Sequence, residues 1–139
     1  MSEHHVAPQL VAILICDEII RDRATFKATL VGLFNLIAAP SFPCVHRGLH
    51  VYVSLTNGHG KAQAELRLVL RETNQVIGRL HGEVQFPDPL AVVEMDYELP
   101  EINFPREGLY SFDLYCDGIL IGARPFRMVR SAAPPAPPR

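Results

Sequence analysis

The sequence predicts an all-β fold: an antiparallel β-sandwich of two sheets, with a partly closed barrel as the alternative. Three observations predict it. Apolar and polar residues alternate with a period of two in several segments. The last of these, Gly108 to Val129, carries Asp117-Gly118 between two alternating runs, the strongest short-range signal of a β-hairpin. No segment shows a convincing helical period. Short strands at such intervals are typical of sandwiches and barrels.

The composition indicates one globular domain with no nucleic-acid partner. The chain has 139 residues, the size of a single domain, and is 48% hydrophobic and 20% charged. Its 13 Lys and Arg against 15 Asp and Glu lack the basic excess that binding many phosphates requires. Three cysteines without a C-x-x-C pair fit reduced thiols in a cytoplasmic protein. Cys16 and Cys116 lie in apolar strand patterns, so we expect them to be buried.

The first strand is predicted from about Gln9 to Ile20, with its apolar run Leu10 to Cys16 at the centre of a sheet. This run is too short to cross a bilayer. No Lys or Arg precedes it and Asp17 follows directly, which argues against a signal peptide. We expect residues 1–8 to be a flexible N-terminus, 9–130 the single domain, and 131–139 a disordered Pro-rich tail.

The second strand is predicted from Lys27 to Ile37 and, because both parities are apolar, as buried on both sides. A Pro-flanked crossing from Ala38 to Gly48 follows, as a loop or a sheet edge. The third strand, Leu49 to Thr56, alternates cleanly. Its inward residues are Leu49, Val51, Val53 and Leu55.

The fourth and fifth strands, Lys61 to Arg71 and Val76 to Phe86, also alternate. Paired strands must place like faces together, and this condition selects one tight register. The expected pairs are Leu68–Gly78, Leu66–Leu80 and Glu65–His81.

The sixth strand is predicted from Val93 to Leu99, because Pro100 ends it, and Ile102 to Phe104 form a further short rung. Tyr110 follows Gly108 at the entry to the final hairpin. This arrangement resembles the tyrosine corner of immunoglobulin-like folds, so the sandwich is predicted to be immunoglobulin-like. The chain has no Trp, so one mark of true immunoglobulin domains is missing.

From Val11 to about Val129 the order of features is similar to a bacterial family of small domains of unknown function, DUF6941. The residues that carry the resemblance are Cys16-Asp17, the strand Lys27 to Gly32 with Phe34 after it, Ser41-Phe42-Pro43, and Gly108, Tyr110 and Phe112. The resemblance supplies no catalytic residue and no ligand. Members often have Gly where this chain has Phe26, which implies a different bend at that position.

No motif in the sequence predicts catalysis, a cofactor or a metal site. Glu94, Asp96 and Glu98 share one face of a strand, but calcium sites need six to eight oxygen ligands from an enclosing loop, so a solvated strand face is the expectation. His46 and His50 are four residues apart without lying on a helix, so they do not form a ligand pair. We therefore predict that the protein is not an enzyme.

Surface residues provide the functional hypothesis, a non-enzymatic protein-binding or assembly module without a nucleic-acid or membrane partner. Tyr115 and Leu120 are expected to be exposed neighbours across the final hairpin, and they join Tyr52 as candidate contacts to a protein partner or to a second copy in a homo-oligomer. End loops, including residues 41–48 and 57–60, are further candidates. The alternative is a small-ligand carrier with a cavity between the sheets. That cavity would be lined by Phe34, Leu66, Met95 and Phe112.

Overall fold

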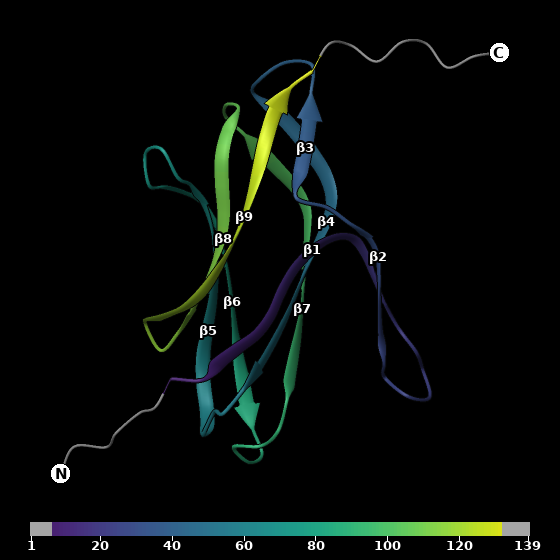
Figure 1. Ribbon diagram of the computed structural model, residues 1–139, viewed down its shortest axis with the longest axis vertical. Coiled ribbons are helices and arrows are strands. Elements are labelled where there is room, and N and C mark those ends of the chain that lie inside the picture. Colours follow the sequence, from purple (N-terminus) through teal and green to yellow (C-terminus); the bar gives the residue numbers. More distant parts are fainter. Residues whose placement is uncertain (1–6, 132–139) are drawn as a thin grey trace.

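The computed structural model describes residues 7–131, which form nine β-strands and no helix (Figure 1). The predicted all-β class is therefore confirmed. The predicted flexible N-terminus and Pro-rich tail lie mostly outside the described residues. The strands are β1 (Gln9–Arg21), β2 (Ala28–Leu33), β3 (Leu36–Ala39), β4 (Cys44–Thr56), β5 (Gly60–Leu70), β6 (Gln75–Phe86), β7 (Val93–Phe104), β8 (Gly108–Cys116) and β9 (Ile119–Arg130).

The strands form two sheets, one in the order β2-β1-β4-β7 and the other in the order β3-β9-β8-β5-β6. All pairings are antiparallel except β3 with β9, which is parallel. The five-stranded sheet curls, so the partly closed barrel also fits (Figure 1). The Tyr110 hydroxyl donates to the Arg106 carbonyl (2.6 Å), as a tyrosine corner requires. The wider immunoglobulin-like assignment stays a prediction.

The core lies between the inward faces of the two sheets. Leu49, Val51, Val53 and Leu55 of β4 are all 0% exposed, as their alternation predicted. Burial of each such side chain stabilises the fold by roughly 1.5–3 kcal/mol. Four aromatic rings pack against one another within this core, with centroids of contacting rings 5.1–6.0 Å apart. Its members are Phe104, Tyr110, Phe112 and Phe126.

Both predicted hairpins are confirmed. The pairs Leu68–Gly78, Leu66–Leu80 and Glu65–His81 lie opposite each other between β5 and β6. Asp117 and Gly118 have φ of 49° and 79°, the left-handed conformation that a tight two-residue turn needs. Cys16 and Cys116 are free and buried.

The prediction of one strand from Lys27 to Ile37, buried on both sides, is wrong. The chain leaves the four-stranded sheet at Leu33 and enters the five-stranded sheet at Leu36, so β2 and β3 lie in different sheets. Gly32 has φ of 70° just before this crossing, a conformation that side chains oppose. Most of β2 is exposed, because it is an edge strand.

Two Pro-based boundaries also differ from the prediction. The segment from Ala38 to Gly48, expected as a loop or a sheet edge, is a loop only between Ala39 and Cys44: β3 extends to Ala39 as an edge strand, and β4 already begins at Cys44. Pro100 does not end β7, which continues to Phe104. β7 is an edge strand, and there a residue without an N–H group can be accommodated on the unpaired side.

Within residues 7–131 the structure contains no helix of the length and apolar character needed to cross a membrane.

Candidate functional site

The three residues predicted as partner contacts do not form one surface. Tyr115 and Leu120 pair across the β8–β9 hairpin, as expected. The Arg67 guanidinium lies over the Tyr115 ring, 4.0 Å from its centroid, while Leu120 is 53% exposed. Tyr52 lies on β4 in the other sheet, where its hydroxyl donates to Glu94. Their role as contacts stays a prediction, and Tyr52 belongs to a different site.

That site is an ionic cluster on the outer face of the four-stranded sheet. Arg21 donates from Nε and Nη2 to Asp96 (2.7 and 2.6 Å) and from Nη1 to Glu94 (2.9 Å). Nη1 also donates to the Phe26 carbonyl (2.9 Å). The hydrogen bonds to Asp96, followed by those to Glu94, raise the pKa of Arg21, and bonds from Tyr52 and Arg21 lower the pKa of Glu94. Glu94, Asp96 and Glu98 are all exposed, as the expected solvated strand face requires, and two of them, Glu94 and Asp96, also bind a cation.

The Arg21 contacts also show that the end of β1 folds back. Leu14 of β1 lies beside Tyr52 of β4, and Tyr52 lies beside Asp96 of β7. Arg21 is seven residues further along β1, roughly 23 Å away in a straight strand. Because it nevertheless binds Asp96, the β1–β2 hairpin must bend across the outer face of the sheet (Figure 1).

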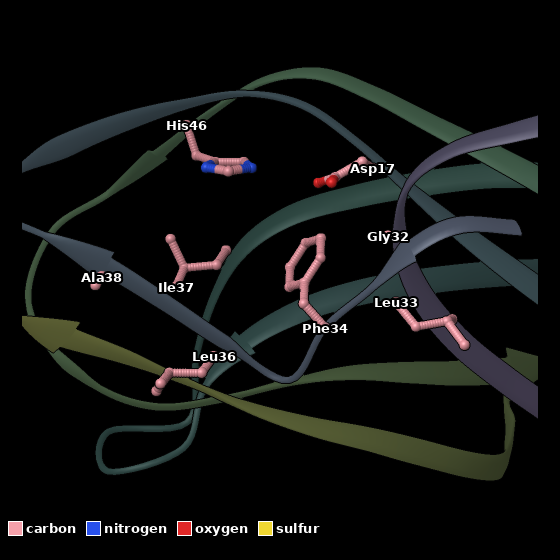
Figure 2. A pocket seen from close by; sticks show the side chains of 8 residues that line it. All are labelled: Asp17, Gly32, Leu33, Phe34, Leu36, Ile37, Ala38 and His46. Atoms are coloured by element: carbon pink, nitrogen blue, oxygen red, sulfur yellow. The ribbon is translucent and has the colours of Figure 1, made fainter. Parts of the chain in front are cut away.

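A pocket of about 340 Å³ lies where the chain crosses between the sheets, and Figure 2 shows its lining. Asp17 reaches it from β1 and His46 from β4, and the Asp17 carboxylate points toward the His46 ring. Phe34 and Ile37 lie below both polar groups. Gly32, Leu33, Leu36 and Ala38 complete the lining.

Backbone hydrogen bonds hold the crossing in place. The Phe34 N–H donates to the Ile15 carbonyl of β1 (3.0 Å), and the Arg127 N–H of β9 donates to the Asn35 carbonyl (3.0 Å). Arg124 adds a side-chain bond to the Asn35 amide oxygen (2.6 Å). The pocket floor is thus fixed to both sheets.

Gly32 leaves room for the Asp17 carboxylate. A Cβ at position 32 would overlap the Asp17 side chain, and φ of 70° would strain any other residue there. The Asp17 carboxylate has no ion-pair or hydrogen-bond partner among residues 7–131, although its backbone carbonyl contacts His50 Nδ1 (3.0 Å). It is free to accept hydrogen bonds from a ligand.

His46 is the second polar group without a partner. Its Nε2 atom is buried and makes no hydrogen bond within the described part of the chain. Burial lowers the pKa of His46, opposed in part by the nearby charge of Asp17. The imidazole is therefore uncharged at neutral pH, and a buried polar atom without a hydrogen bond is costly. A ligand at this position would relieve that cost.

The rim of the pocket is apolar and exposed. Leu33 and Leu36 are 59% and 55% exposed, and the Phe34 ring lies 6.2 Å from the His46 ring. The pocket therefore joins two polar groups to an apolar floor and rim, as ligand sites commonly do. No group of three or more His, Cys, Asp or Glu suited to a metal ion occurs in residues 7–131.

Sequence reasoning did not identify this site. The sequence uses Asp17 as evidence against a signal peptide and as part of the family resemblance, and His46 as a residue unsuited to metal binding, and neither pattern predicts a pocket. The available signal was Gly32 within a run of strand-forming residues, since such a Gly marks a bend or a close approach.

Comparisons with known proteins identify the family. No curated protein matches the chain. The model of a family described as "Family of unknown function (DUF6941)" matches residues 11–129, which include the pocket, the ionic cluster and all but the outermost strand residues. The chain therefore belongs to DUF6941, a family whose function is unknown.

Proposed function

We propose that the protein is a non-enzymatic protein-binding module whose contact surface is centred on the pocket at the β2–β3 crossing. The observation that carries this proposal is an exposed Asp17 carboxylate without a protein partner and a buried His46 Nε2 atom without a hydrogen bond, both beside exposed Leu33 and Leu36. Polar groups that a fold does not satisfy, surrounded by exposed apolar side chains, are typical of recognition surfaces.

The fixed backbone of the crossing supports this proposal. A surface held in its bound shape loses less conformational entropy on association, so it binds more tightly for the same contacts. The crossing is bonded to β1 on one side and to β9 on the other. Leu33 and Leu36 are thus presented from a rigid frame.

The carrier hypothesis ranks second and requires a different location. Two of the four residues expected to line an inter-sheet cavity, Leu66 and Phe112, are only 1% exposed and pack in the core. Phe34 instead lines the surface pocket. If the protein carries a small ligand, we expect the ligand in that pocket.

Three further expectations remain part of our proposal. The near-neutral charge supports the lack of a nucleic-acid partner, and the free cysteines support a cytoplasmic location. Self-association into a homo-oligomer is the third, with a second copy of the chain as the partner.

Two matched variants test the proposal. Leu36 and Leu120 are 55% and 53% exposed, one at the pocket and one at the predicted hairpin contact. We would purify the tagged wild type, Leu36→Glu and Leu120→Glu from the native host and measure partners by light scattering and quantitative mass spectrometry.

The proposal predicts a stoichiometric protein partner that Leu36→Glu loses and Leu120→Glu keeps. Loss in Leu120→Glu alone would move the contact to the β8–β9 hairpin. A wild-type chain that is a bare monomer would contradict the binding-module proposal.

A further inference from the structure

We infer that the pocket at the β2–β3 crossing binds a lysine side chain presented by a protein partner. Its ammonium group would lie between the Asp17 carboxylate and His46 Nε2, with its alkyl chain over Phe34 and Ile37. This inference rests on the proposed function and names the chemistry that the site recognises.

The charge of the pocket favours a cationic ligand. Asp17 is the one acidic residue in the lining, and the lining contains no Lys or Arg. By contrast, Arg21 of β1, Arg67 of β5 and Arg79 of β6 each lie beside a carboxylate of this chain. A carboxylate left without a cation beside apolar surface complements a positive group that a partner supplies.

The polar atoms suit an ammonium group. Asp17 Oδ and His46 Nε2 come from two different strands and face the same space (Figure 2). An ammonium group carries three donors on one atom, so it suits a site that offers acceptors from two side chains. Burial keeps the imidazole uncharged, so His46 does not repel the cation.

The apolar part of the pocket suits an unbranched alkyl chain. Lysine buries its methylene groups on apolar surface while its charged end seeks a polar partner. The Phe34 ring and Ile37 provide that surface below the polar atoms. The volume of about 340 Å³ is near the lower end of known ligand sites, roughly 300–1,000 Å³, and fits one side chain better than a large cofactor.

The test uses a small probe, so it does not depend on knowing the partner. Nα-acetyl-lysine methylamide, which keeps the side-chain ammonium group, would be titrated into the full ¹⁵N-labelled chain. Backbone amide shifts would be followed by NMR. N-acetyl-norleucine methylamide is the matched probe, because it keeps the alkyl chain and lacks the charge. We expect saturable shifts at Asp17, His46 and residues 32–38, with norleucine binding roughly tenfold more weakly, about 1.4 kcal/mol.

Two matched variants separate charge from fold. Asp17→Asn should weaken lysine binding roughly tenfold, whereas Glu18→Gln, which removes an adjacent exposed carboxylate outside the pocket, should leave binding unchanged. Both should keep the wild-type urea midpoint. The inference is overturned if lysine produces no saturable shifts, if norleucine binds equally well, or if folded Asp17→Asn binds as tightly as the wild type.

The outcomes distinguish this inference from the proposed function. If Leu36→Glu loses a partner but capped lysine does not bind, the module remains and the lysine pocket is wrong. If capped lysine binds but the wild type has no stoichiometric partner, the binding-module proposal is wrong, and with it the assignment to a partner's lysine.

Discussion

Two charged residues of β1, Arg21 and Asp17, lie four positions apart in contrasting environments. Arg21 binds Asp96, Glu94 and a backbone carbonyl, so every charge in its cluster is paired. Asp17 is exposed beside His46 and apolar side chains, and its carboxylate has no hydrogen-bond or ion-pair partner among residues 7–131. A saturated cluster holds the fold and has little capacity left for a ligand, whereas an unpaired charge at a pocket can recognise one.

The largest expected effect comes from removing the cation of the Arg21 cluster, in which every charge is paired. Arg21→Met leaves Asp96 and Glu94 close together without a cation and releases the folded-back hairpin. Because the cluster is partly exposed but bidentate, we expect the free energy of unfolding to fall by about 1.5 kcal/mol, measured by urea denaturation. Arg23→Met, at an exposed position in the turn that follows Arg21, is the control and should change the free energy of unfolding by less than about 0.5 kcal/mol. An equal loss in both variants would show that the Arg21 cluster does not hold the hairpin.

The second effect is an increase in the free energy of unfolding, and it concerns the tip of the β1–β2 hairpin. Phe26 is 72% exposed and has φ of 58°, a conformation that costs a bulky residue energy. Phe26→Gly should therefore raise the free energy of unfolding by about 1 kcal/mol. Phe26→Ala keeps the Cβ and should leave most of the strain. A Phe26→Gly chain that melts below the Ala variant would contradict this account.

The smallest effect concerns the pocket and is the dependence of stability on pH that His46 produces. The sign of this dependence tests the burial of the imidazole. Burial lowers the pKa of His46 in the folded chain, so the unfolded chain binds more protons as the pH falls below about 6.5. Above that pH the imidazole is uncharged in both states and burying it carries no charge penalty. Below that pH, protonation of His46 favours the unfolded chain, so the folded chain loses stability. Between about pH 7.5 and pH 5, wild type should lose more stability than His46→Gln in thermal melts. His59→Gln, at an exposed turn, should behave like the wild type.

The sequence predicts the regular strands well and the pocket poorly, for one physical reason. Alternation is local, so the register of β5 with β6 follows from their own residues. The pocket instead joins Asp17, His46 and the crossing at residues 33–36, which only the arrangement of both sheets brings together. The sequence does not predict the crossing, because the apolar residues from Leu30 to Ile37 occupy both alternating positions. This pattern is typical of one continuous strand that is buried on both faces.

The parallel pairing of β3 with β9 has a consequence for the order of folding. β3 hydrogen-bonds only to β9, so residues 36–39 have no sheet partner until residues 127–130 have been synthesised. Strands β1, β2 and β4 can pair much earlier on the ribosome. One wall of the pocket is therefore completed last, so a nascent chain that lacks its final strand can pair the strands of Asp17 and His46 but cannot complete the pocket.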